Sequence, residues 1–142
     1  MAGYNYAAAH DNDRHSQKMT VNRGRVAKVR ITPTLCPIVE TFTLRQVGVD
    51  WVVSIVSRDK WEGSVVRTSR KLDANCVDHQ IAQLQSAKIP VVFKGEMSCD
   101  GWLVEVTIYS DTGTLSASWW TELPDGAETL GRFVEWLRGV CE

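Results

Sequence analysis

The residues with the clearest potential for chemistry are a cysteine and a histidine three positions apart. Cys76 and His79 lie in a segment with helical periodicity, and a helix would place their thiol and imidazole on one face. Nucleophilic catalysis also needs a group that orients the histidine and donors that stabilise an oxyanion, and the sequence shows no pattern for either. We therefore interpret Cys76 as a packed residue and His79 as solvent-facing, and predict no enzymatic activity and no catalytic residues.

A second group of candidate ligands lies near the N-terminus. His10, Asp11, Asp13 and His15 are metal-binding residue types, but their spacing defines no geometry, and the polar segment would have to become ordered on binding. The four cysteines are at least 23 positions apart, which gives no metal-knuckle spacing and favours free thiols. The sequence therefore predicts neither a metal site nor a cofactor.

Charge is unevenly distributed along the chain. Residues 1–71 contain 12 Lys/Arg and 6 Asp/Glu, a balance of +6, whereas residues 72–142 contain 4 and 11, a balance of −7. The halves either form surfaces of opposite charge, which would steer charged partners, or neutralise each other within one fold. A basic cluster could contact nucleic acid, but the pI near 6.3, the acidic second half and the lack of interleaved aromatics argue against it. This cluster consists of Arg14, Lys18, Arg23, Arg25, Lys28 and Arg30.

The first half of the chain has the pattern of a β-meander. Short alternating segments separated by brief polar connections are typical of antiparallel strands, and they occur at 26–32, 38–45, 51–57 and 64–70. A helix follows, with Asp73 as its N-cap and Pro90 at its end, because the residue before a proline avoids the α region. The segment Pro90–Lys94 could add an edge strand.

The second half predicts a hairpin and then an amphipathic helix. Residues 102–109 and 115–120 alternate in polarity on either side of a turn that contains Gly113. Apolar residues then recur at helical spacing from Leu130 to Leu137, and Asp125 is a candidate N-cap.

Together these segments predict an α+β fold. We expect an antiparallel sheet of six or seven strands with two helices on one face, in the order β-β-β-β-α-β-β-β-α. Residues 1–24 are polar and aperiodic and predict a flexible N-terminal tail, and residues 25–142 predict a single domain. The sequence shows no apolar run long enough to span a bilayer and no signal peptide, so we expect a cytoplasmic protein without membrane association.

Six tryptophans are the most distinctive feature of the composition. Trp119 and Trp120 are adjacent on one strand, so their rings should lie on opposite faces of the sheet. Exposed aromatic residues commonly anchor protein interfaces, and acidic residues beside them would favour a basic partner. The predicted binding residues are Trp61, Trp120, Trp136, Glu122, Asp125 and Glu128.

Several of these residues also carry a resemblance to known proteins. Asp100-Gly101-Trp102, the run Ser118–Gly126 that contains Trp119-Trp120, and then Leu130 and Trp136-Leu137 resemble the C-terminal half of small, mostly uncharacterised bacterial proteins. Several members of that group are predicted immunity proteins that neutralise a neighbouring toxin. The resemblance covers residues 100–137 and assigns no functional residue.

These observations predict a non-enzymatic protein-binding domain. Its expected role is that of an immunity-type inhibitor that occludes a partner protein, and the acidic residues favour a basic toxin such as a nuclease as that partner. One alternative is a small-ligand-binding protein or enzyme with a pocket between sheet and helices, lined by Trp51 and Trp102. Another is a homodimer that pairs two open sheet faces.

Overall fold

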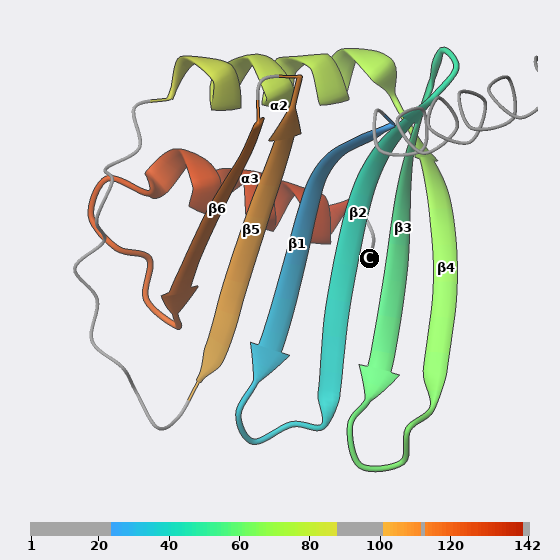
Figure 1. The fold of residues 1–142 in the computed structure, drawn as a ribbon, viewed down its shortest axis with the longest axis vertical. Coiled ribbons are helices and arrows are strands. Elements are labelled where there is room, and N and C mark those ends of the chain that lie inside the picture. Colours follow the sequence, from blue (N-terminus) through green and yellow to red (C-terminus); the bar gives the residue numbers. More distant parts are fainter. Residues whose placement is uncertain (1–23, 88–100, 112, 141–142) are drawn as a thin grey trace, which may run out of the picture.

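The computed structural model describes residues 24–87, 101–111 and 113–140. Six antiparallel strands form one sheet in the order β4-β3-β2-β1-β5-β6, and two helices pack against it (Figure 1). In chain order the elements are β1 (Arg25–Pro33), β2 (Ile38–Val47), β3 (Asp50–Asp59), β4 (Val65–Leu72), α2 (Ala74–Ser86), β5 (Trp102–Ser110), β6 (Gly113–Trp120) and α3 (Glu128–Gly139).

The chain builds the sheet outward from β1 in both directions. β1 to β4 form a meander, and after α2 the chain returns so that β5 pairs with the free side of β1. Asp73 caps α2, because its carboxylate accepts hydrogen bonds from the backbone amides of Asn75 (2.9 Å) and Cys76 (3.1 Å). A strand from the first half is therefore at the centre of the sheet, with a strand from the second half beside it.

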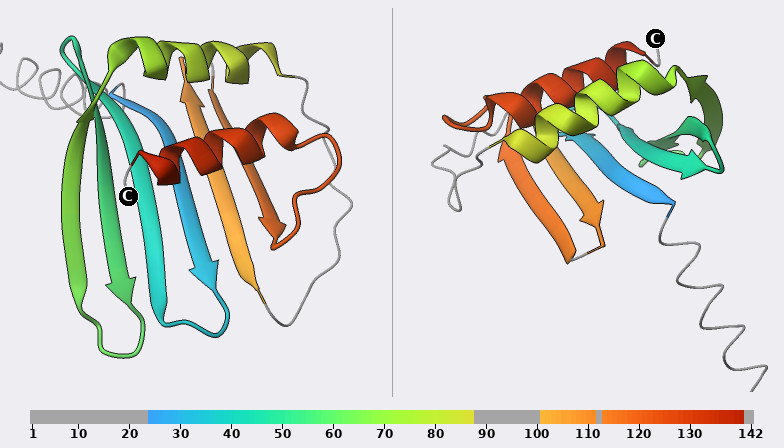
Figure 2. Two further views of the ribbon diagram at one scale, coloured as in Figure 1. Left: turned by 180° about the vertical axis from the view of Figure 1, so that it is seen from behind. Right: turned by 90° about the horizontal axis from the view of Figure 1, so that it is seen from above.

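Both helices cover the same face of the sheet, as the view from above shows (Figure 2). The core lies between this face and the helices, and its largest fully buried side chains include Leu44 from β2 and Phe133, Leu130 and Leu137 from α3. Each such side chain contributes about 1.5–3 kcal/mol by its removal from water. On the outer strand β4, by contrast, every residue except Leu72 is exposed.

The structure confirms the predicted fold class and the arrangement of helices on one face. Six of the predicted strands are present, and the additional strand predicted at Pro90–Lys94 lies outside the described residues. Almost all of the predicted tail, with the candidate metal ligands His10 to His15, also lies outside them.

Three local predictions are settled by the structure. Trp119 is buried beneath the helices and Trp120 lies on the opposite face, as the alternation requires. The predicted cap at Asp125 is wrong: Ala127 occupies the N-cap of α3 and forms no side-chain capping bond. Cys76 is exposed, so its predicted packing is also wrong, because only Val77 of α2 is buried in the core.

Neither α2 nor α3 is long and apolar enough to cross a bilayer, and these are the helices found among the described residues.

Candidate functional site

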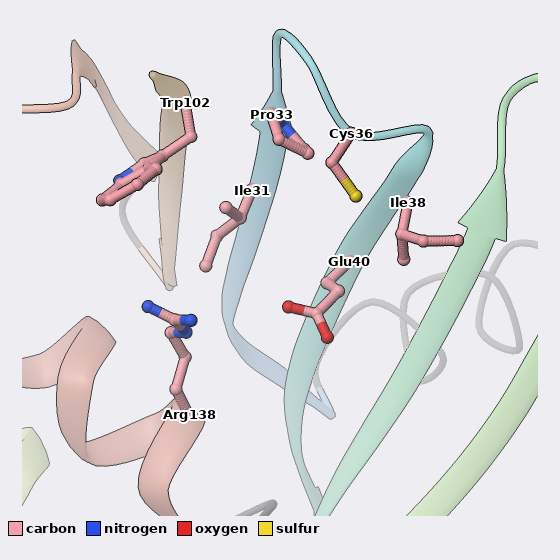
Figure 3. A pocket seen from close by; sticks show the side chains of 7 residues that line it. All are labelled: Ile31, Pro33, Cys36, Ile38, Glu40, Trp102 and Arg138. Atoms are coloured by element: carbon pink, nitrogen blue, oxygen red, sulfur yellow. The ribbon is translucent and has the colours of Figure 1, made fainter. Parts of the chain in front are cut away.

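A groove opens on the helix-covered side, at the lower end of the sheet in Figure 1, where β1, β3 and β6 terminate. Helix α3 crosses the sheet above this end and leaves the last residues of β1 and the first residues of β2 and β5 uncovered. The groove has a volume of about 300 Å³. Its lining residues, shown in Figure 3, are Ile31, Pro33, Cys36, Ile38, Glu40, Trp102 and Arg138.

Charged side chains face each other across this apolar floor. The carboxylate of Glu40, from β2, and the guanidinium of Arg138, from α3, both point into the space between them (Figure 3). Trp102 forms one wall and is 44% exposed. The groove therefore offers an aromatic surface, an exposed thiol at Cys36 and one charge of each sign.

Hydrogen bonds formed by the backbone of Gly101 and Trp102 hold Trp102 in position. The carbonyl of Gly101 accepts hydrogen bonds from the amide and the hydroxyl of Thr34, both 2.9 Å long. The Trp102 amide donates to the hydroxyl of Thr121 (3.2 Å), and the Thr121 amide donates to the Trp102 carbonyl (2.8 Å). Gly101 has φ +138°, and a Cβ there would collide with the Thr121 side chain, so only glycine is tolerated at this position.

A second hollow of about 340 Å³ adjoins the groove and shares Ile31, Trp102 and Arg138 with it. Leu123, from the segment between β6 and α3, and Glu128, the first residue of α3, help to line it. Leu123 is 38% exposed.

Glu128 takes the place of a side-chain cap at the start of α3. Its own backbone amide and that of Gly126, at 3.2 Å, donate to its carboxylate, and these bonds hold the pKa of Glu128 below the usual value. The positive charge of Arg132 lowers the pKa further. Glu128 is therefore ionised over the whole neutral range and presents a negative charge beside the hollow.

Four of the six predicted binding residues follow one another in the chain at the end of β6 and the start of α3, but Trp120 points to the face opposite Trp102. Trp120 ends β6, and Glu122, Asp125 and Glu128 follow within eight residues. We use the name acidic corner for Trp102, at the start of β5, together with Leu123, Glu122, Asp125 and Glu128, from the segment that runs from the end of β6 to the first residue of α3 (Figure 1).

The other two predicted binding residues lie elsewhere. Trp61 is 75% exposed, but it lies in the turn between β3 and β4, on the far side of the sheet from the acidic corner. Trp136 is partly buried against the core, and its ring centroid lies 5.8 Å from that of Phe133.

Trp102 and Leu123 were not among the predicted binding residues. Trp102 shares the inward alternation of Val104 and Val106, which favours a core position, and it does point to the helix side. It is exposed because it is the first residue of its strand and lies beyond the edge of α3. Two residues were predicted to line a ligand pocket between the sheet and the helices. Trp102 does line the groove, whereas Trp51 is buried in the core.

Cys76 and His79 form no hydrogen bond with each other. Both are exposed on α2, and the only hydrogen bond of the His79 side chain in the described part of the chain is with Gln83, at 3.1 Å. No group of three or more His, Cys, Asp or Glu within residues 24–87, 101–111 and 113–140 could hold a metal ion.

Comparison of the chain with protein-family models, with curated proteins and with solved structures finds no match. The expected relation to immunity proteins therefore stays a prediction from the residues of 100–137.

Proposed function

We propose that this domain is a non-enzymatic binding protein that recognises a partner protein through the acidic corner. The observation that carries this proposal is that two exposed apolar side chains, Trp102 and Leu123, line one hollow with Glu128. Two further carboxylates, Glu122 and Asp125, lie near Leu123 in the chain. Interfaces have a desolvated apolar centre and a polar rim, and this corner has both parts.

The partner that fits this corner carries a basic surface around an apolar contact. Complementary charge would speed the encounter, and burial of the Trp102 ring would slow dissociation. In its specific form the proposal is an immunity-type inhibitor that occludes a basic toxin such as a nuclease. The motif resemblance of residues 100–137 supports that specific form.

The test is capture from the native host with matched variants of the full chain. Trp102→Ser should lose the partner that the unmodified protein retains. Val49→Ser should retain it, because Val49 is 87% exposed in the turn at the opposite end of β2 and β3. Equal capture by both variants would contradict the proposed site.

A second assay addresses the inhibitor role separately. The captured partner is purified and its enzymatic activity is titrated with this protein, and full inhibition is expected at one equivalent. An unchanged activity would refute the immunity-type role and leave the binding role standing.

A small-ligand-binding role is the second candidate, and the groove favours it. Its volume of about 300 Å³ and the adjoining hollow of about 340 Å³ lie at the small end of the range for ligand sites. A compound screen by thermal shift should find ligands whose stabilisation disappears in Arg138→Ala. No such compound in the screen would count against this role.

A further inference from the structure

The open face of the sheet, opposite the helices, is organised in rows that cross all six strands. The strand registers place one residue from each strand side by side in the central row, and five of the six carry hydroxyl groups while the sixth is a lysine. In order from β4 to β6 this row consists of Ser69, Ser54, Thr43, Lys28, Thr107 and Ser116. At about 4.8 Å per strand, the row extends for about 24 Å.

Cationic side chains lie on both sides of this hydroxyl row. The neighbouring rows contribute Arg67 and Arg30 on one side and Lys71, Arg45 and Arg25 on the other, and Arg58 lies further along β3. With Lys28, seven cations share the face.

The strands place only two carboxylates on this face, within the part of the chain that the structure describes. Glu105 lies 3.9 Å from Arg30, and Asp50 lies 2.8 Å from Lys71. Seven cations and two carboxylates leave a net formal charge of +5. Among the described acidic residues of the second half, most lie on the helices or just before α3 and not on this face. These residues are Asp78, Glu122, Asp125, Glu128 and Glu135.

One pair of cations has no explanation within the fold. Arg25 of β1 is the direct cross-strand neighbour of Arg45 of β2, and like charges in such positions destabilise a sheet. The Nε atoms of both side chains are buried and have no hydrogen-bond partner among the described residues. Buried donors in that state cost free energy. An anion bound beside the two guanidinium groups would offset the repulsion between their charges.

We infer that this face binds single-stranded nucleic acid through its phosphates. Guanidinium groups and hydroxyls are the side-chain groups that most often contact phosphate oxygens, and the hydroxyl row with its flanking cations offers them along a continuous path. Tyr109 and Trp120 lie on the same face, on β5 and β6, where a base can stack. Both helices lie on the other face (Figure 2), so no helix among the described residues projects from this face to enter the groove of a duplex, and a single strand fits better.

This basic surface could not be recognised from the sequence, because its cations come from four strands that are separated along the chain. Of the basic cluster between Arg14 and Arg30, Arg25, Lys28 and Arg30 belong to the face, and the other members lie outside the described residues. The remaining four cations of the face come from β2, β3 and β4. The pI near 6.3 and the acidic second half argued against nucleic acid, but the pI averages two sides of opposite charge.

The test is fluorescence anisotropy of the full chain with a labelled 20-nucleotide single strand of mixed sequence at 50 mM salt. We expect binding that weakens steeply with added salt, because released counterions contribute to the affinity. Arg45→Glu and Arg67→Glu should each weaken binding at least tenfold. Lys60→Glu is the matched control with the same change in net charge, since Lys60 lies in the β3–β4 turn and donates to the Pro33 carbonyl.

The other outcomes would overturn the inference. No binding at 50 mM salt, or an equal loss in Lys60→Glu, would remove the face as a nucleic-acid site. A duplex that binds as tightly as the single strand would contradict the single-strand assignment. Poly-glutamate that competes as well as unlabelled oligonucleotide, per charge, would reassign the face to an acidic protein. Trp102→Ser, in the acidic corner, should leave oligonucleotide binding unchanged.

Discussion

The two faces of the sheet are built from the same six strands but present opposite chemistry. One face is apolar and covered by α2 and α3, and its residues, such as Val29, Phe42 and Val106, form the core. The other carries hydroxyls and a net formal charge of +5 on its strands. Strand alternation produces this difference, because successive side chains point to opposite faces. The covered face therefore holds the core that stabilises the fold, whereas the other face is the one for which binding is proposed above.

The largest expected effect is on the covered face. Phe133→Ala should lower the free energy of unfolding by about 3–5 kcal/mol, because Phe133 is fully buried and its loss leaves a cavity. Thr43→Ala, at the centre of the open face, should change it by less than about 0.5 kcal/mol. Urea denaturation of the two variants measures the contrast. Similar losses in both would mean that the open face also carries the stability of the fold.

The second-largest loss of stability is expected for a substitution of Gly101, at the lower end of the sheet. Gly101→Ala should destabilise the protein by roughly 1–3 kcal/mol, because alanine is strained at φ +138° and its Cβ would collide with the Thr121 side chain. The same change should displace Trp102 and weaken partner capture at the acidic corner. Thermal unfolding and capture are the measurements. Gly139→Ala is the control, since an added methyl group there meets nothing within 4 Å.

A smaller effect of opposite sign is expected on the open face. Arg45→Glu replaces a repulsive cross-strand pair with an attractive one opposite Arg25, and should raise stability by about 0.2–1 kcal/mol. The same variant should lose affinity for the oligonucleotide. Urea denaturation and anisotropy on one preparation test both statements. A variant that is both less stable and fully able to bind would contradict the assigned role of this pair.

The smallest expected effect is the pH dependence that Glu128 contributes. Its pKa is lowered in the folded state, so its stabilisation is present at neutral pH and is lost as the pH falls from about 4.5 through the folded-state pKa. Glu128→Gln should therefore have a lower Tm than the unmodified protein at pH 7. The difference should shrink toward pH 3. A difference that does not depend on pH would show that the carboxylate charge is unimportant at this helix start.

The parts of the fold that follow from local patterns were predictable. The alternation of residues 102–109, the turn at Gly113 and the helical stripe that includes Phe133 all correspond to elements of the structure. The cap of α3 was predicted at the wrong residue, because Asp125 has the right chemistry but the helix begins later. A side chain suited to capping does not determine the residue at which a helix starts.

The candidate site was only partly predictable. The three acidic residues of the acidic corner were identified from composition and neighbourhood in the chain. Trp102 was not, because its exposure depends on where α3 crosses the sheet. Burial depends on contacts between distant segments, and periodicity along one segment carries no information about them.

The sequence by itself determined which residues share a strand face, since alternation with a period of two is local to each strand. It determined that Trp119 and Trp120 point to opposite sides, and that the two halves of the chain differ in charge. Only the tertiary structure decided that β5 pairs with β1, that Arg25 lies opposite Arg45 and that the hydroxyls align in one row. These features arise from pairing between strands, which is set by the packing of the whole core against both helices.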